Sequence, residues 1–285
     1  MPEQDPSFRP RRSVLYVPAV NPRALDKARG LACDGVILDL EDSVAPEAKP
    51  AAREAAMAAV GGFGDREVAI RCNGLDTPWG LDDLRAAARA APDAVLAPKI
   101  RSVEDLAAYE AALAAAPAKT RLWIMVETAQ AVLDLGAIAA EAPGKRLAAL
   151  VLGSNDFAAE LRLKPAFMDA ALRPVRLQMA LAARAHGLVA LGAAFTGIDD
   201  AAGFEAEAME EAGFGFDGKT VVHPSQIEPA NCIFSPSPEE IEWAKTVVAA
   251  FAAPEAAGKG VLRLEGGMVE HLHLREAERV LAMSR

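Results

Sequence analysis

The sequence predicts an α/β protein, a (β/α)8 TIM barrel with a short C-terminal helical appendage. Short apolar runs rich in β-branched residues alternate with longer, alanine-rich amphipathic segments, as in βα units around a parallel sheet. Eight runs of each kind follow one another, more than a doubly wound sheet typically uses. A chain of 285 residues is also a usual length for one such barrel.

The expected strands are short and bounded by polar or glycine-containing segments. They cover residues 13–17, 35–40, 67–72, 94–99, 121–127, 147–153, 188–193 and 219–223. Many of the helical segments have Pro, Ser, Asp or Asn near the start, which suits a first helical turn. These segments begin near Pro22, Pro46, Trp79, Val103, Gln130, Ala166, Asp199 and Pro236.

The last part of the chain does not fit the barrel count. Four glycines between residues 258 and 267 predict a turn-rich excursion, followed by a final helix at about 274–283. We therefore expect a barrel over residues 1–253 and an appendage over residues 254–285.

Composition excludes several classes of partner. A formal net charge of −10 argues against a nucleic-acid or anionic-membrane surface, because such partners need an excess of Lys and Arg. No apolar run approaches the roughly 18 residues of a membrane span, and the first residues lack the features of a secretory signal. We expect a cytoplasmic protein whose three dispersed cysteines form neither a disulfide framework nor a zinc cluster.

Polar side chains follow most of the expected strands. In a barrel of this type the catalytic groups lie at the C-terminal ends of the strands, so these side chains are the candidates for a site. They are Asp39, Glu41, Asp42, Arg71, Asn73, Lys99, Glu127, Ser154, Asn155, Asp156 and His223.

Glu127 and Asp156 are expected on adjacent strands, facing one cavity. Their charges would repel unless a cation lay nearby. Two carboxylates, with the other positions left to water and substrate, suit Mg²⁺, which dehydrates reluctantly. Zinc is disfavoured because the histidines offer only the His271 and His273 pair, in the appendage.

Glu41 and Asp42 have two interpretations that the sequence leaves open together. They could accept hydrogen bonds from metal-bound waters and so hold the ion indirectly. Alternatively, they could pair with Arg71, Lys99 or Arg12 in a structural network under the barrel mouth.

The chain resembles a known family over nearly its whole length. The strings RRSVLYVPAVNPRALDKARGLACDGVILDLEDSVAPEAKPAAR, IRCNG, APKI, VETA, LGSNDF and GKTVVHPSQIEPAN occur in the expected order. They resemble the citrate lyase β-subunit-like (CitE-like) branch of the HpcH/HpaI aldolase superfamily, which includes malyl-CoA and citramalyl-CoA lyases.

This resemblance implies a Mg²⁺-dependent enzyme that cleaves or forms a carbon–carbon bond in a short 3-hydroxyacyl-CoA thioester. It implies Glu127 and Asp156 as metal ligands and Arg71 as a substrate contact. Further residues that it places around the acyl-CoA or keto-acid substrate are Tyr16, Arg23, Lys27, Ser154, Asn155, Val222 and His223. It also implies a homotrimer or homohexamer in which the appendage covers a neighbour's barrel mouth.

Two positions depart from the resembling enzymes. The stretch GGMVEH has Glu270 where the acid/base aspartate is expected, and Gly192 stands where many relatives have aspartate. The leading hypothesis is a lyase with Arg71 and Glu270 as catalytic residues. The alternatives are an aldolase on a free hydroxy-keto acid, a thioester hydrolase of the same superfamily, and a non-catalytic CitE-like subunit.

Overall fold

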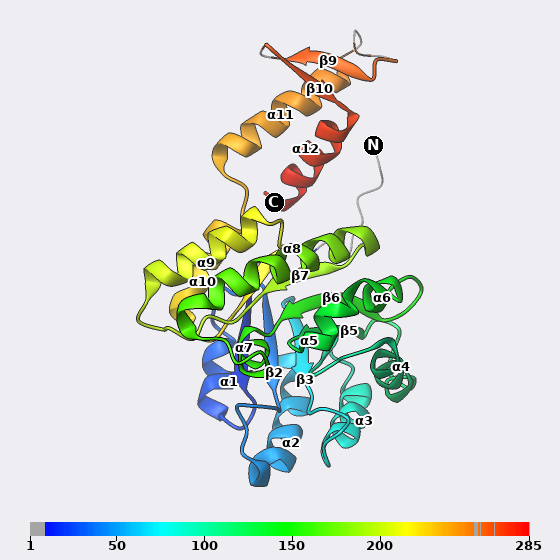
Figure 1. The fold of residues 1–285 in the computed structure, drawn as a ribbon, viewed down its shortest axis with the longest axis vertical. Coiled ribbons are helices and arrows are strands. Elements are labelled where there is room, and N and C mark those ends of the chain that lie inside the picture. The colour runs from blue at the N-terminus through cyan, green and yellow to red at the C-terminus, as the bar shows by residue number, and fades with distance from the viewer. Residues whose placement is uncertain (1–8, 254–255, 257, 265, 285) are drawn as a thin grey trace. The chain divides into compact units, whose positions relative to one another are not determined.

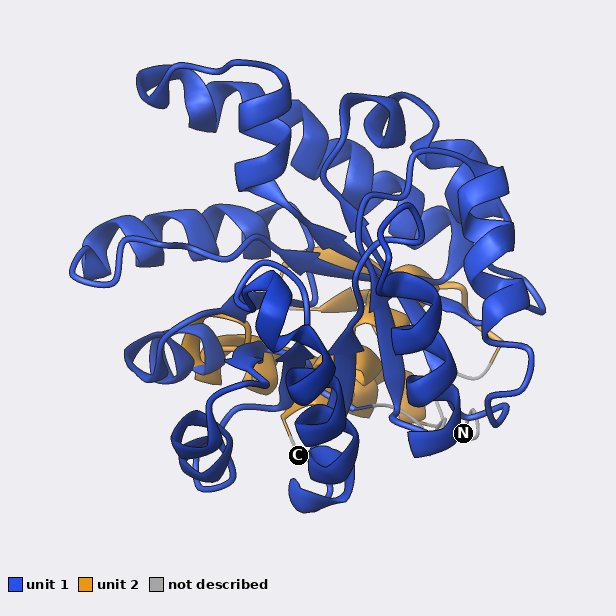
Figure 2. Ribbon diagram, turned by 90° about the horizontal axis from the view of Figure 1, so that it is seen from below, with its two compact units in different colours: residues 1–231 blue, residues 232–285 orange. Residues whose placement is uncertain are grey.

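A computed structural model describes residues 9–253, 256, 258–264 and 266–284. The chain forms two compact units, which divide between Asn231 and Cys232 and are coloured separately in Figure 2. The boundary expected from the sequence lies later, after residue 253. Helix α11 (Pro238–Ala252) nevertheless belongs with the second unit, because it packs on the last helix of the chain.

The first unit contains a closed barrel of eight parallel strands, as predicted (Figure 1). Strand β1 pairs with both β2 and β8, which closes the sheet. The strands are β1 (Ser13–Pro18), β2 (Gly35–Asp39), β3 (Glu67–Arg71), β4 (Ala94–Ala97), β5 (Arg121–Val126), β6 (Leu147–Leu152), β7 (Val189–Gly192) and β8 (Gly218–Val221).

Helices follow the strands and lie around them in the view of Figure 2. They are α1 (Pro22–Ala28), α2 (Lys49–Ala59), α3 (Gly80–Ala90), α4 (Val103–Ala112), α5 (Ala129–Leu133), α6 (Leu135–Ala140), α7 (Ser154–Glu160), α8 (Met168–His186), α9 (Ala201–Gly213) and α10 (Ile227–Ile233). Side-chain caps fix several starts; for example, Asn21, Ser102 and Thr128 each accept a backbone hydrogen bond from the first turn. The short helix α7 was not predicted.

Alternate residues of each strand fill the barrel interior. Ile37, Leu96, Trp123, Val151 and Leu191 are among the buried side chains of this core. Because side chains of a strand alternate between its two faces, the next inward position toward the C-terminal end of each strand faces the barrel mouth. The interior is packed, so the space for a ligand lies at the mouth.

The second unit consists of α11, a two-stranded antiparallel sheet and α12 (His271–Met283). The strands are β9 (Val261–Leu264) and β10 (Gly267–Glu270). Its buried core comprises Ala244, Val247, Val269, Ala277 and Val280. The final helix was predicted, whereas the hairpin was described only as a turn-rich excursion.

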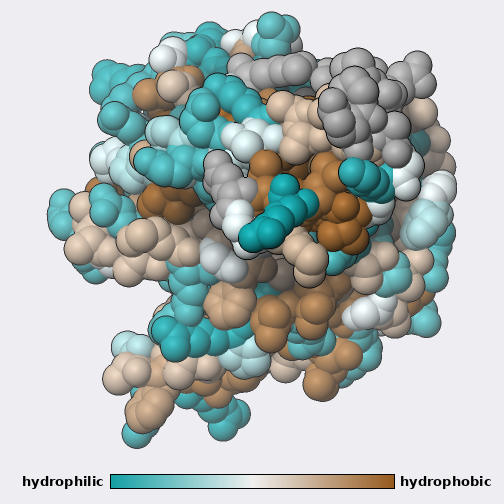
Figure 3. Space-filling model, turned by 90° about the horizontal axis from the view of Figure 1, so that it is seen from above, coloured by the Kyte–Doolittle hydropathy of each residue, from teal (hydrophilic) through white to brown (hydrophobic). Residues whose placement is uncertain are grey.

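Exposed hydrophobic side chains of this unit include Trp243, Val261, Met268 and Leu272. Figure 3 shows that hydrophobic residues gather at several places on the face seen from above, beside hydrophilic ones. Within the part of the chain that the structure describes, no helix is both long and apolar enough to cross a membrane.

Candidate active site

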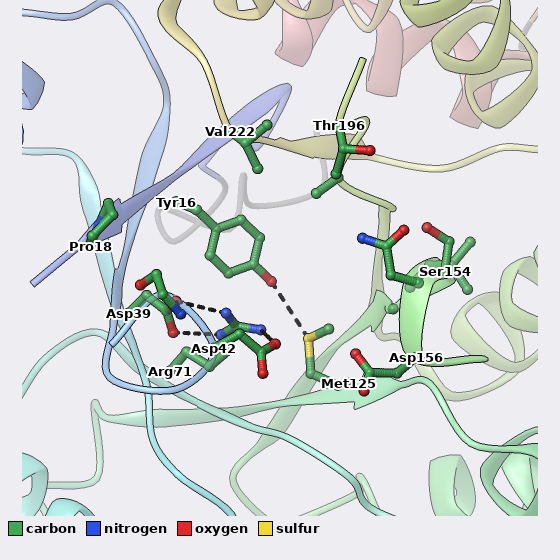
Figure 4. A pocket seen from close by; sticks show the side chains of 15 residues that line it. Tyr16, Pro18, Asp39, Asp42, Arg71, Met125, Ser154, Asp156, Thr196 and Val222 are labelled. Atoms are coloured by element: carbon green, nitrogen blue, oxygen red, sulfur yellow. Dashed lines mark hydrogen bonds and ion pairs between the residues drawn. The ribbon is translucent and has the colours of Figure 1, made fainter. Parts of the chain in front are cut away.

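A cavity of about 380 Å³ opens at the C-terminal ends of the barrel strands. Figure 4 shows side chains from several strands and the loops after them around this space. The lining residues are Tyr16, Pro18, Asp39, Asp42, Ser43, Arg71, Met125, Leu152, Gly153, Ser154, Asn155, Asp156, Ala194, Thr196 and Val222. The cavity therefore lies where the barrel fold predicts a site.

Arg71 and Asp39 form a buried pair on one wall. They are partners on the adjacent strands β3 and β2, and both occupy inward positions. The Arg71 guanidinium donates from Nε to Asp39 Oδ1 and from Nη2 to Asp39 Oδ2, each over 2.7 Å (Figure 4). This two-pronged geometry matches the planar guanidinium to the carboxylate and fixes the orientation of both.

The same guanidinium binds the loop after β2. Arg71 Nη1 lies 3.0 Å from Glu41 Oε2 and 3.1 Å from Asp42 Oδ2. Its centre lies 4.9 Å from the Tyr16 ring centroid, a cation–π distance. Burial raises the pKa of Asp39, but the charge and hydrogen bonds of Arg71 outweigh burial and hold that pKa below its ordinary value.

Lys49 stabilises the loop after β2 through hydrogen bonds to its backbone. Its buried ammonium donates to the carbonyl oxygens of Leu40 and Glu41, each over 3.0 Å, and lies over the Trp79 ring. The loop carbonyls are thereby satisfied inside the protein, and the Glu41 side chain is free to face the mouth.

Glu127 follows β5 directly and is not itself among the residues that line the cavity. Its Oε1 accepts a hydrogen bond of 2.7 Å from the backbone N–H of Lys99. A Cβ atom at Gly153 would lie 2.5 Å from Glu127 Cβ and 2.7 Å from Oε2, so glycine is required for this close approach. Glu127 therefore packs directly against Gly153, which lines the cavity.

Lys99 contacts Glu127 through its backbone N–H, and Glu41 and Asp156 through its ammonium group. Its Nζ lies 3.4 Å from Glu41 Oε1 and 3.5 Å from Asp156 Oδ1. Burial, followed by the charge of Glu41, raises the pKa of Glu127 to about 7, and Asp156 adds to this shift. Burial likewise raises the pKa of Glu41. The carboxylates of the mouth thus repel one another despite Arg71 and Lys99.

This donor set fits a magnesium ion. Glu127 and Asp156 provide hard carboxylate oxygens, and the cavity leaves room for water and substrate. A cation would relieve the repulsion that disfavours ionised Glu127. Across the described ranges, no three His, Cys, Asp or Glu side chains converge into a ready-made cage, a situation that Mg²⁺ tolerates and structural zinc does not.

The predicted site residues divide into two groups. Tyr16, Asp42, Arg71, Ser154, Asn155, Asp156 and Val222 line the cavity, with Glu41 and Glu127 directly behind its wall. Arg23 and Lys27 instead lie on the exposed face of α1 and are not among the lining residues. His223 is also not among the lining residues; it caps the short 3-10 helix Pro224–Gln226 through Nδ1.

Three other expectations are resolved by the structure. The proposed pairing of Glu41 with Arg71 and Lys99 is confirmed, but the pairing with Arg12 is wrong. Arg12 pairs with Asp34 at the start of β2, the other end of the barrel. Gly192 follows an inward-facing residue and therefore faces outward, where the Glu211 carboxylate occupies the space that a side chain would need.

Glu270 ends β10 and caps α12 in the second unit. Its side chain accepts from the backbone of His273, while its own N–H donates to His273 Nδ1 over 2.9 Å. Glu270 is an exposed residue and is not among the residues that line the barrel cavity.

Among the lining residues, Met125 and Thr196 were given no role from the sequence, and Asp39 was noted only as a polar residue at a strand end. For Asp39 a signal existed, since a carboxylate at a strand end lies two residues beyond an inward apolar position and next to Arg71. Met125 and Thr196 carry no such signal, because apolar and small polar residues are common at these places.

Comparison with known proteins identifies the family. The sequence profile of HpcH/HpaI aldolase/citrate lyase matches residues 12–224. The chain belongs to this family. The match covers the barrel from the start of β1 to the end of β8, and the resemblance noted from the sequence is thereby confirmed.

Relatives in the family include enzymes named for two reactions. A (3S)-malyl-CoA thioesterase of Cereibacter sphaeroides is 44% identical over 96% of this chain and 94% of its own length. An L-malyl-CoA/β-methylmalyl-CoA lyase of the same species is 31% identical over 96% of this chain and 94% of its own length.

A solved structure of a family member has the same fold. The CitE protein of Mycobacterium tuberculosis, in complex with magnesium, acetoacetate and coenzyme A, is 31% identical with a TM-score of 0.78. The similarity covers 98% of both chains. The relatives thus include enzymes named as a lyase and as a thioesterase of CoA thioesters, and this chain is similar in structure to the CitE protein over 98% of its length.

Proposed function

We propose that this protein is a Mg²⁺-dependent enzyme that hydrolyses a short 3-hydroxyacyl-CoA thioester of the malyl-CoA kind. The observation that carries this proposal is the 44% identity to a (3S)-malyl-CoA thioesterase over 96% of the chain. The lyase that the sequence analysis favoured has a named relative at 31% identity. Carbon–carbon cleavage of the same substrate is therefore the second candidate.

Glu127 and Asp156 are the proposed ligands of the ion. This assignment is supported by three observations: Asp156 lines the cavity, Glu127 packs against the lining residue Gly153, and the related CitE complex contains magnesium. When bound, the ion supplies Lewis-acid stabilisation of negative charge on substrate oxygens. Glu41 and Asp42 are proposed to accept hydrogen bonds from its waters, while Arg71 keeps both in place.

Arg71 is the proposed anion-binding group of the pocket. Its guanidinium is permanently charged, and Asp39 and the Tyr16 ring fix its plane. A fixed donor of this kind stabilises negative charge that develops on a substrate oxygen, typically by about 10²–10³ in rate. Ser154 and Asn155, at the start of α7, offer further polar contacts for the acyl group.

Both candidate reactions need one proton-transfer group, which we propose to be Glu270. In hydrolysis, the water oxygen bonds to the thioester carbon, the carbon–sulfur bond breaks, and a proton passes to the departing thiolate. In cleavage, the bond between the hydroxyl-bearing carbon and the carbon next to the thioester breaks. The hydroxyl group loses its proton as its oxygen becomes the carbonyl oxygen of the released acid, and the enolate carbon takes up a proton. A carboxyl group serves either reaction.

Product analysis with (3S)-malyl-CoA separates the candidates. Hydrolysis releases malate and free CoA thiol, which a disulfide reagent detects; cleavage releases glyoxylate and acetyl-CoA with no free thiol. We expect Mg²⁺-dependent release of thiol and malate in equal amounts. Glyoxylate with intact acetyl-CoA would select the lyase, and no turnover by a folded, Mg²⁺-loaded protein would contradict both.

A further inference from the structure

Lys99 has an unusual backbone. Its φ is +54°, in the left-handed region that residues with a side chain rarely adopt. Within the described residues, Ala91 and Arg162 are the other non-glycine residues with positive φ, and Ala91 ends α3 as a left-handed cap. Lys99 has no such role, since it follows β4 at the barrel mouth. Strain of this kind persists where the surroundings require the geometry.

The strained backbone directs two donors of one residue into the mouth. The Lys99 N–H points to Glu127 Oε1 at 2.7 Å. The ammonium lies 3.4 Å from Glu41 Oε1 and 3.5 Å from Asp156 Oδ1. These ammonium contacts are ion pairs longer than a good hydrogen bond, so the group is held by charge and can shift without breaking a directed bond.

The ammonium is a cation among the carboxylates proposed to bind Mg²⁺. Burial lowers the pKa of Lys99, but the charges of Glu41, Asp156, Glu127 and Asp42 outweigh burial and raise it. Its side chain remains 36% exposed, so it has room to move toward solvent. A divalent ion bound to Asp156 would repel an ammonium that stays in place.

We propose that Lys99 is a positioning residue whose ammonium substitutes for the divalent cation in the metal-free protein. It then contacts both Glu41 and Asp156, and it moves away from Asp156 when Mg²⁺ binds. This inference rests on the metal site of the proposed function. Its consequence is that the mouth stays assembled without metal, while Mg²⁺ binding is weakened by competition and remains readily reversible.

Calorimetric titration with Mg²⁺ alone tests the exchange in the full-length, metal-free protein. Lys99→Met removes the charge and keeps most of the side-chain length. Because the competing cation is gone, we expect Lys99→Met to lower the Mg²⁺ dissociation constant by about tenfold. Lys99→Arg keeps the charge and should bind Mg²⁺ about as weakly as the wild type. Lys119→Met, on the exposed turn before β5, is the matched control and should change nothing.

Thermal unfolding in EDTA provides the second readout. We expect Lys99→Met to melt below the wild type without metal, because its carboxylates lack a counter-ion, and to gain more from added Mg²⁺. An increase in metal affinity cannot arise from simple damage to the site, so the two readouts together identify competition.

Several results would overturn the inference. If the wild type binds Mg²⁺ and turns over a thioester while Lys99→Met binds the ion equally or more weakly, the Lys99 inference fails and the proposed function stands. Equal melting of the two proteins in EDTA would also overturn it. If Mg²⁺ neither binds nor stabilises the wild type, the exchange fails together with the metal part of the proposed function.

Discussion

At the scale of single residues, the site is organised by charge. Arg71 contacts Asp39, Glu41 and Asp42 at once, and Lys99 contacts Glu41 and Asp156. These contacts explain why the sequence places so many carboxylates after β2. They orient the Arg71 guanidinium, and they supply the negative charge that the proposed cation site requires.

We predict that Arg71→Lys lowers kcat/KM for the thioester by about 10²–10³. Lysine keeps one positive charge but cannot donate to both oxygens of Asp39 in one plane, so the anion-binding group loses its orientation. Steady-state kinetics measures the effect. Arg85→Lys on the exposed face of α3 is the control, and wild-type activity in Arg71→Lys would contradict the role.

The raised pKa of Glu127 predicts a pH dependence of stability in the metal-free protein. Its pKa is about 7 in the folded state and near 4.5 when unfolded, so the folded state holds the extra proton between these values. The free energy of unfolding therefore falls as pH rises from about 4.5 to 7.

The variant Glu127→Gln has no titratable group at this position. Between pH 5 and pH 8 we expect the wild type to lose about 2 kcal/mol more unfolding free energy than Glu127→Gln, as measured by urea denaturation without metal. If the unfolding free energies of the two proteins changed with pH in parallel, the prediction of a raised Glu127 pKa would be contradicted.

The roles of individual residues were predictable where a charged side chain stands at the end of an expected strand. Glu127, Asp156 and Arg71 stand at strand ends, where alternation and barrel closure bring charged groups together. The pairing of Lys99 with Glu41 was expected from the sequence, but its left-handed φ and its backbone hydrogen bond to Glu127 were not, because the sequence does not signal them. Arg23 and Lys27 were placed near the substrate by the family resemblance. They lie on the exposed face of α1, outside the residues that line the cavity, and their role stays a prediction.

At the scale of elements, the eight strands were predictable because each is a short apolar run that ends in polar residues. The hairpin of β9 and β10 was not, because its strands are half-exposed and lack an apolar run. The departure at Gly192 is also explained at this scale. Gly192 faces Glu211 of α9. The Glu211 carboxylate accepts hydrogen bonds from Lys219 Nζ over 2.8 Å and from the N–H of Ala193 over 3.1 Å.

We predict that Gly192→Ala destabilises the protein by about 1–3 kcal/mol. The new Cβ atom would lie 1.9 Å from Glu211 Oε2, so the buried ion pair with Lys219 must shift. Chemical denaturation measures the change. Gly136→Ala, in helix α6 where a Cβ atom meets nothing within 4 Å, is the matched control and should be neutral or slightly stabilising. Equal stability of both variants would contradict this packing.

At the scale of the whole molecule, the barrel holds the groups of one cavity on separate strands, and the family places thioester chemistry on this fold. The fold class followed from the alternation of strands and helices, and the structure confirms it. The choice between hydrolysis and cleavage could not follow from the sequence, since the proposed metal ligands, anion-binding group and proton-transfer group would serve either reaction.

We also predict that the protein assembles as a homotrimer or homohexamer, as the resemblance implies. Light scattering coupled to gel filtration should give three or six times the chain mass of 29.9 kDa. A monomer at micromolar concentration would contradict this expectation and the proposed role of Glu270 at a neighbour's barrel mouth, and would leave the barrel residues as described.

The central claim is that Glu127 and Asp156 bind one divalent ion beside Arg71. The most direct measurement is anomalous diffraction from crystals soaked with Mn²⁺, which takes the same oxygen ligands as Mg²⁺. We predict one strong peak at roughly 2.0–2.2 Å from a carboxylate oxygen of each residue, lost in Glu127→Gln. A peak elsewhere, or none at saturating Mn²⁺, would contradict the account.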